Sequence, residues 1–214
     1  VPRLEKETGH TFDVSYSYQD PRTDTVAVTM DNEPFRDENG EIFFRPGGHG
    51  ALIQNLNEQE ADLIFIKNID NVVIPSNRKL LSSYKKMLAG KLLQLREKSF
   101  EYLRDLEKGV GEAQLQEMGE FLQNDLNAGL DIKFQDLNEE EKPSVIKRLL
   151  NRPLRVCGMV KNEGEPGGGP FWVAHKNGEI SLQIVESSQI DHDNYQQSKI
   201  AQEATHFNPV DVVC

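Results

Sequence analysis

Two features of this sequence, a glycine-rich turn and a carboxylate at the end of an apolar run, could bind a ligand together. Residues 45–50, RPGGHG, form a loop with almost no side-chain bulk, and residues 51–56 can begin a helix directly on it. The apolar run at residues 61–69 predicts a buried strand, with Asp70 and Asn71 at its carboxyl end. A glycine loop that opens a helix offers free backbone N–H groups to an anion or a base edge. Ligands of open α/β sheets bind just outside the carboxyl ends of strands, so the two features predict one binding crevice.

Each of these residues also has an interpretation without a ligand. The Gly-Gly-x-Gly pattern also fits a tight turn that needs positive φ angles, and Asp70 also fits a turn or cap position. His49 stands between glycines with little apolar cover, which also suits a solvated loop residue. It is the combination that favours binding.

The composition limits the classes of function. The chain has 214 residues, 37% hydrophobic and 28% charged, which suits one soluble domain or one domain with a helical insertion. No apolar run approaches the length of a transmembrane helix. The formal net charge of −11 argues against non-specific binding to nucleic acid or to anionic membranes, because both need a basic face. A nucleotide would therefore need a local cluster of Lys and Arg, or a divalent cation, to hold its phosphates.

The cysteines and the ends of the sequence suggest the setting of the chain. Cys157 and Cys214 do not make a disulfide framework, so we expect a cytoplasmic protein. The chain starts at Val1 without Met and stops at Cys214 inside an apolar run, which suggests a fragment of a longer protein. A sheet without its first strands exposes an edge, so we expect self-association or pairing with the missing N-terminal part.

Hydrophobic periodicity divides the chain at residues 76 and 152. Residues 1–76 are interpreted as the central part of an α/β domain, with a helix at 2–8 and strands at 12–18, 23–30, 42–44 and 61–69. Residues 77–152 are interpreted as a helical insertion, with helices at 77–108, 112–126 and 143–150. Residues 153–214 return to the sheet, with strands at 154–160, 171–174, 180–186 and 210–214 and a helix near 195–204.

The first helix of the insertion carries apolar residues at a spacing of three to four, which predicts core packing rather than a cofactor site. They are Leu80, Tyr84, Leu88, Leu92, Leu95, Tyr102 and Leu106.

The order of several short strings resembles one known family. A Gln ending a strand is followed by Gly-His-Gly, Ile-Asp-Asn, Ile-Val-Glu-x-Ser-x-Ile and Phe-Asn. This order resembles the nucleotide-diphosphate-sugar pyrophosphorylases of the UDP-sugar and UDP-N-acetylhexosamine type, which share the nucleotidyltransferase fold with GT-A glycosyltransferases. The match is closest to a bacterial branch, a domain of unknown function, with the fuller strings RPGGHGAL, FIKNIDNVV, NEGEPGGGPFW and THFNPVD.

The resemblance implies a fold and a reaction. The fold would be α/β, with a mixed, mostly parallel sheet flanked by helices, incomplete, and interrupted by the helical insertion. The reaction would transfer a nucleotidyl group from a nucleoside triphosphate, with UTP expected, to a sugar-1-phosphate, and would release pyrophosphate. The expected partners are therefore a nucleotide and a sugar phosphate, and the expected cofactor is Mg²⁺.

The resemblance also implies roles for single residues on the nucleotide side. Gln19 would hold the uracil together with the loop residues Gly48, His49 and Gly50. Asp70 would bind the divalent cation that bridges the phosphates, with Asn71 beside it.

On the sugar side, Glu186 would contact the sugar hydroxyls, Asn208 would contact the sugar, and Gly168 would lie in a sugar-contacting glycine loop. Lys67 and Lys161 are the basic residues near the predicted site, although surface lysines often only solvate a fold. Of these two, Lys67 is the predicted catalytic residue beside Asp70.

The sequence departs from the family in two places. The family's glycine-rich phosphate loop, LAAGxGTRM, has no counterpart in this chain, and Ser187 stands where the family usually has tyrosine. We therefore expect this piece alone to be inactive. A rival hypothesis is a non-catalytic nucleotide- or sugar-binding regulatory module on the same fold, and a third is an α/β interaction domain whose loops are structural.

Overall fold

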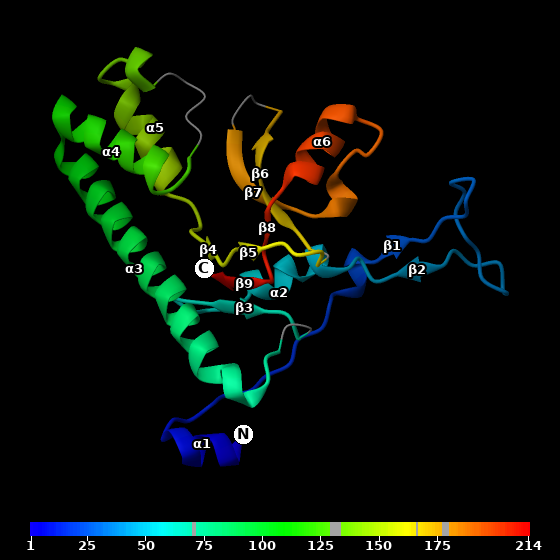
Figure 1. Cartoon of the computed structure of the whole chain (residues 1–214). Helices are drawn as coiled ribbons and strands as arrows, with labels where there is room; N and C mark the ends of the chain where they lie inside the picture. Colours follow the sequence, from blue (N-terminus) through cyan, green and yellow to red (C-terminus); the bar gives the residue numbers. More distant parts are fainter. Residues whose placement is uncertain (70–71, 129–133, 166, 177–179) are drawn as a thin grey trace. The chain divides into compact units, whose positions relative to one another are not determined.

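The computed structural model covers the whole chain and describes residues 1–69, 72–128, 134–165, 167–176 and 180–214 (Figure 1). The chain divides into two compact units, Val1–Asp62 and Leu63–Cys214, which are described separately. In the described residues, no helix has the length and apolar character needed to cross a membrane.

The first unit begins with α1 (Pro2–Thr8), which has proline in its first turn and ends at Gly9. Gly9 adopts a left-handed φ of 71°, which glycine tolerates at a helix end. This agrees with the helix predicted at 2–8. Further along, a short 3₁₀ turn, η1 (Pro21–Thr23), is capped by the side chain of Asp20.

The predicted strand at residues 12–18 is wrong. This segment forms no strand pairing in the described structure. The side chains of Phe12, Val14, Tyr16 and Tyr18 are all exposed. Alternation of apolar and polar residues makes a strand only when a neighbouring strand accepts its hydrogen bonds.

The remainder of the first unit is a small antiparallel hairpin followed by a helix. β1 (Thr25–Val26) pairs with β2 (Phe44–Arg45). Residues 37–40 form a turn, in which the Gly40 N–H donates to the Asp37 carbonyl. After the glycine loop, η2 (His49–Leu52) leads directly into α2 (Ile53–Asn57), as predicted.

The second unit contains a helical bundle. After the 3₁₀ turn η4 (Pro75–Asn77), α3 (Arg78–Lys108) packs with α4 (Glu112–Asn124) and α5 (Glu141–Leu150). The bounds lie close to those predicted, because glycine ends α3 and the apolar spacing is regular. A further 3₁₀ turn, η5 (Phe134–Asp136), precedes α5.

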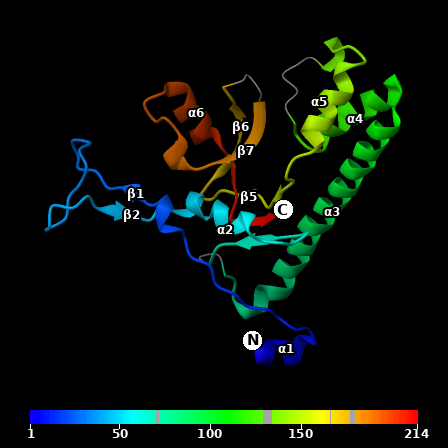
Figure 2. The ribbon, with the colours of Figure 1, turned by 180° about the vertical axis from the view of Figure 1, so that it is seen from behind.

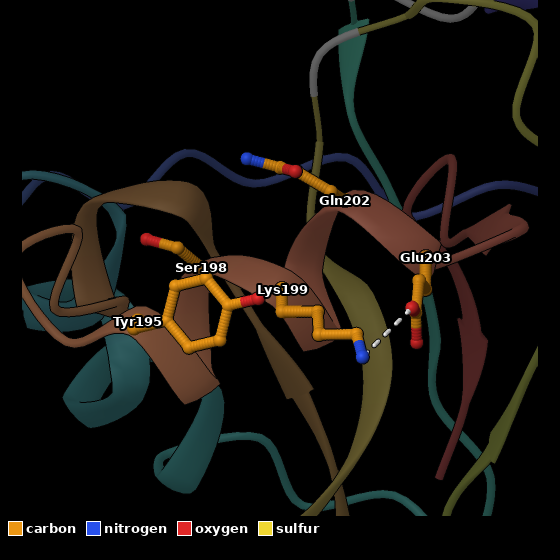
Figure 3. Close-up of a pocket in the computed structure, with 5 residues that line it drawn as sticks. All are labelled: Tyr195, Ser198, Lys199, Gln202 and Glu203. Atoms are coloured by element: carbon orange, nitrogen blue, oxygen red, sulfur yellow. Dashed lines mark ion pairs between the residues drawn. The ribbon is translucent and has the colours of Figure 1, made fainter.

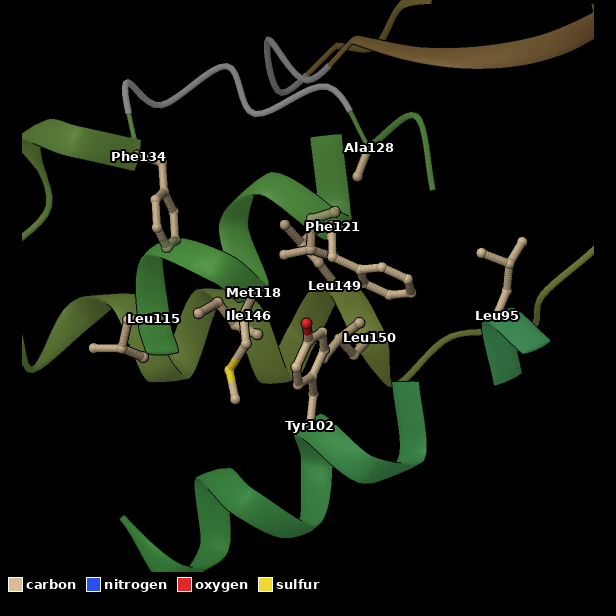
Figure 4. Packing of buried hydrophobic residues seen from close by; sticks show 11 residues of the cluster. Leu95, Tyr102, Leu115, Met118, Phe121, Ala128, Phe134, Ile146, Leu149 and Leu150 are labelled. Atoms are coloured by element: carbon tan, nitrogen blue, oxygen red, sulfur yellow. The ribbon is translucent and has the colours of Figure 1, made fainter. Parts of the chain in front are cut away.

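The bundle holds the main hydrophobic core, of which Figure 4 shows side chains from α3, α4 and α5. Leu122 and Ile146 are fully buried in it. Of the predicted stripe on α3, Leu92, Leu95 and Tyr102 are buried. The prediction is wrong for Leu80 and Tyr84, which are 61% and 56% exposed. The bundle core takes its α3 residues from the later turns of the helix, so these two early residues lie outside it.

A three-stranded sheet joins distant parts of the second unit. Its order is β3 (Phe65–Lys67), β9 (Asp211–Val213), β4 (Val156–Cys157), and both outer strands run antiparallel to β9. β3 and β4, which the bundle connects, therefore run in the same direction with β9 between them. The chain is mixed α/β, but the strand pairings of the described residues are antiparallel. The expected mostly parallel sheet is not found there, because β9 separates the two strands that share a direction.

Two smaller ladders complete the second unit. β5 (Val160–Lys161) pairs with β8 (His206–Phe207), and the hairpin strands β6 (Gly169–Ala174) and β7 (Ile180–Val185) pair with each other. Both views show α6 (Tyr195–Glu203) beside this hairpin (Figures 1 and 2). The short turn η6 (Ser187–Gln189) follows β7.

Candidate functional site

Lys67, the predicted catalytic lysine, lies at the end of β3 in a three-residue charge cluster. Its Nζ lies 2.8 Å from Oδ2 of Asp211, the residue opposite it on β9. Nζ of Lys85, from α3, lies 3.2 Å from the other carboxylate oxygen, Oδ1. One largely buried carboxylate is therefore shared by two lysines, and the cluster carries a net charge of +1.

Asn208, predicted to contact a sugar, is buried three residues before Asp211. Its Nδ2 donates to the carbonyl of Gly158 at 2.6 Å, and its Oδ1 accepts from the N–H of Val210 at 3.0 Å. Val210 has a left-handed φ of 56°, which strains a β-branched residue. Asn208 thus holds the turn that leads into Asp211.

Gly168 and Glu186, both predicted on the sugar side, lie against each other. A Cβ added to Gly168 would come within 2.9 Å of Oε1 of Glu186 and 2.6 Å of Cγ2 of Ile184. The carbonyl of Gly168 accepts a hydrogen bond from the Asn208 N–H at 2.8 Å. Glycine is needed here for close approach, and the Glu186 side chain is exposed to solvent.

These contacts form one continuous chain within the second unit. It runs from Glu186 through Gly168 to Asn208, and the Asn208 side chain then bonds the Gly158 carbonyl. The Gly158 N–H donates to the carbonyl of Asp211 at 2.7 Å, and Asp211 pairs with Lys67. The structure thus brings together four of the residues singled out from the sequence.

The remaining nucleotide-side residues form a second group, inside the first unit. Nε2 of Gln19 donates to Thr23 Oγ1 at 2.9 Å and lies near Asp24 Oδ1 at 3.2 Å. A Cβ added to Gly47 would lie 3.6 Å from the same nitrogen, so Gln19 stands beside the glycine loop.

The loop residues themselves are accessible. Gly48 has a left-handed φ of 73°, His49 begins η2 with an exposed side chain, and Gly50 has open space around it. The loop is therefore a tight turn, in which Gly48 adopts the positive φ that such a turn requires. It is also a surface that a ligand can reach.

Asp70, predicted to bind the metal, and Asn71, predicted to lie beside it, fall outside the described residues, three and four positions after Lys67. Within the described ranges, no group of three or more His, Cys, Asp or Glu side chains could hold a metal ion. Mg²⁺ is commonly held by one or two carboxylates together with phosphate oxygens and water. Among the residues singled out from the sequence, Asp70 is the one predicted to supply such a carboxylate.

Lys161, the other basic residue predicted near the site, lies in β5 opposite His206 and is exposed. It is not among the residues of the contact chain described above.

Both cysteines are free thiols. Burial raises the pKa of Cys157 and of Cys214, and the nearby Arg155 guanidinium opposes the rise in both. A raised pKa disfavours the thiolate at neutral pH.

A pocket lies on the surface of α6 (Figure 3). An ion pair of 3.9 Å between Lys199 and Glu203 spans part of it. It is lined by residues of this one helix, Tyr195, Ser198, Lys199, Gln202 and Glu203. A hollow formed by a single helix has no second wall to enclose a ligand.

A family model described as a domain of unknown function (DUF4301) matches residues 1–214. The chain belongs to this family. No curated protein and no solved structure matches the chain.

In this DUF4301 chain, sequence reasoning missed two residues of the charge cluster. Asp211 stands 144 positions from Lys67, so only the pairing of β3 with β9 brings them together. Lys85 lies on a helix that was interpreted from its apolar residues alone. Its position four residues before Ala89 and seven before Leu92, both buried, was the available signal that it faces the sheet.

Proposed function

We propose that the chain is part of a nucleotidyltransferase that transfers a nucleotidyl group, with UTP as the expected donor, to a sugar-1-phosphate. The proposal includes an incomplete GT-A-like nucleotidyltransferase fold and a cytoplasmic location. The observation that supports it best is the contact chain of the second unit. It connects the sugar-side candidates Gly168, Glu186 and Asn208 to Lys67 at the end of β3.

The residue types suit this reaction. A phosphate oxygen of the sugar-1-phosphate attacks the α-phosphorus of the triphosphate, and pyrophosphate leaves, so no covalent enzyme intermediate is needed. Such a reaction depends on positioning and on stabilisation of negative charge. Lys67 would stabilise the phosphates, and Glu186, with its exposed carboxylate, would accept hydrogen bonds from sugar hydroxyls.

The metal belongs to the same proposal. Asp70, after β3, would hold Mg²⁺ with Asn71 beside it, and the ion would supply charge neutralisation for the phosphates. The uracil would bind at Gln19 and the loop Gly48–His49–Gly50, where the backbone is open.

The test is pyrophosphate release in the protein that carries this chain. It is incubated with UTP, MgCl₂ and a set of hexose-1-phosphates, and we expect release that depends on one sugar phosphate. Asp70→Asn should abolish turnover and leave the thermal unfolding curve unchanged. The matched control is Asp62→Asn, at an exposed position before β3, which should retain activity. Equal activity in both variants would remove Asp70 from the mechanism.

The second candidate function is a non-catalytic nucleotide- or sugar-binding module. It is favoured by the Asn208 side chain, whose Nδ2 and Oδ1 are both bonded inside the chain, as in a structural residue. Under this hypothesis, calorimetry shows binding of UTP or sugar phosphate, but no hexose-1-phosphate gives pyrophosphate release.

A further inference from the structure

We propose that Lys67 and Lys85 together form a phosphate-binding site, and that Asp211 is the residue that positions both lysines. The expected occupant is pyrophosphate or the corresponding phosphates of the nucleotide. This choice of ligand rests on the proposed function, but the phosphate-binding site itself follows from the geometry of the cluster.

The strand register places two of the three residues. Lys67 and Asp211 are directly opposite each other at one end of the β3–β9 ladder. Opposite residues of an antiparallel pair project from the same face of the sheet. The 2.8 Å contact between Lys67 Nζ and Asp211 Oδ2 is therefore set by the backbone pairing.

The third residue is placed by the packing of α3 on that face. Asp211 and Val213 are two residues apart on β9, so their side chains point to the same side of the sheet. Val213 is 1% exposed and packs with Ala89 and Leu92 of α3. Lys85 lies on the same stripe of α3, one turn before Ala89. The apolar contact thus fixes the helix and brings the Lys85 ammonium to Asp211.

Solvent access differs between the lysines and the carboxylate. The Asp211 side chain is 14% exposed, whereas those of Lys67 and Lys85 are 22% and 26% exposed. Oδ1 of Asp211 makes no hydrogen bond, although Lys85 Nζ lies 3.2 Å from it. The contact between Lys85 and Asp211 is therefore an ion pair without a hydrogen bond. Each ammonium group has three donors, so both lysines can also bind an anion.

The contrast with Lys142 separates this cluster from an ordinary buried pair. Lys142 is nearly buried, with a side chain 9% exposed, and forms an ion pair with Glu112. That pair has one charge of each sign and joins two helices. The cluster at Asp211 instead has one surplus positive charge and a more open pair of cations.

The turn before Asp211 is built to hold it in place. Val210 adopts a left-handed φ, although this conformation is unfavourable for a β-branched residue. The Asn208 side chain bonds the Val210 N–H, and the Gly158 N–H bonds the Asp211 carbonyl. Backbone strain of this kind persists where the surrounding bonds over-determine it.

The test is calorimetric titration of the 214-residue chain with inorganic pyrophosphate in buffer without Mg²⁺, so that Asp70 and the metal do not contribute. The unmodified chain should bind. Lys85→Gln should weaken binding about 10- to 100-fold, the usual effect of losing a charge-assisted hydrogen bond. The control is Lys86→Gln, an equal charge change at an exposed neighbour on the same helix, which should change the Kd less than about twofold.

Asp211→Asn tests the positioning role by the sign of its effect. Removal of a negative charge alone would tighten pyrophosphate binding, whereas loss of the anchor for two lysines should weaken it. Circular dichroism confirms that the variant is folded, and Lys85→Arg, which keeps the charge, should retain most of the affinity.

The proposal is overturned if the unmodified chain does not bind pyrophosphate, or if Lys85→Gln and Lys86→Gln behave alike. Tighter binding by folded Asp211→Asn would remove its positioning part. These outcomes are separable from the proposed function. Pyrophosphate binding without nucleotidyl transfer would support the phosphate-binding site and contradict the proposed function. Nucleotidyl transfer that Lys85→Gln does not impair would contradict the phosphate-binding site and leave the proposed function in place.

Discussion

The α3–α5 bundle and the strand region 154–214 bury different kinds of residue. The bundle core consists of aliphatic and aromatic side chains such as Leu122, Ile146 and Phe121. In the described part of the strand region, the buried residues are Gly168, Gly169, Asn208 and Val213. Burial of large apolar groups provides stability, whereas buried glycine and asparagine determine how closely and at what angle segments meet. The two regions therefore divide stability and positioning between them.

The largest effect should come from the bundle. Ile146→Ala removes a fully buried side chain and leaves a cavity, so it should lower the free energy of unfolding by about 2–5 kcal/mol. Chemical denaturation followed by circular dichroism measures the change. Ile200→Ala, at a residue 57% exposed on α6, is the matched control and should stay within about 0.5 kcal/mol. Similar losses at both positions would contradict the division between the regions.

The next effect should come from the strand region. Asn208→Ala leaves the Gly158 carbonyl and the Val210 N–H without their partner, so it should cost about 2 kcal/mol. It should also weaken pyrophosphate binding, because Asp211 loses its supporting turn. Asn55→Ala, which removes one hydrogen bond to the Tyr18 carbonyl at a less buried position, should cost under about 1 kcal/mol and leave binding unchanged. Loss of stability without any loss of pyrophosphate binding would show that the turn does not support the binding site.

The smallest effect is confined to alkaline pH. Burial, and then the hydrogen bond to Glu117, raise the pKa of Tyr102 from 10.0 to about 12, although Lys98 opposes the rise. The neutral phenol is favoured in the folded state, so its contribution to stability is complete below pH 10 and is lost as pH rises through about 12. The difference in unfolding free energy between the unmodified chain and Tyr102→Phe should therefore be constant up to pH 10 and shrink above it. A pH-independent difference would show that the phenol ionises alike in the folded and unfolded states.

The local elements could be predicted from the sequence because their signals are local. The helix at Arg78–Lys108 follows from apolar spacing and a terminal glycine, and the helix after Gly48 follows from the loop that precedes it. The same reasoning failed at residues 12–18, where strand-like alternation has no partner strand. It also failed at Leu80 and Tyr84, because an apolar face is buried only where another element covers it.

The site could be predicted only in part, because its connections are not local. Single residues such as Lys67, Gly168 and Asn208 were recognised from short strings. Their proximity in the structure depends on β9, which lies between β3 and β4 and brings Asp211 to Lys67. No property of the residues near position 211 specifies which strand will lie beside them.

The cluster of Lys67, Lys85 and Asp211 has one surplus positive charge, but the whole chain has a formal net charge of −11. A phosphate approaching from solution meets the repulsive field of the whole chain first and the attraction of the two lysines only at short range. Dissolved salt screens the distant charges more strongly than the contacting ones. Association should therefore be slower in dilute buffer than at physiological ionic strength, the reverse of the kinetics usual for cationic sites.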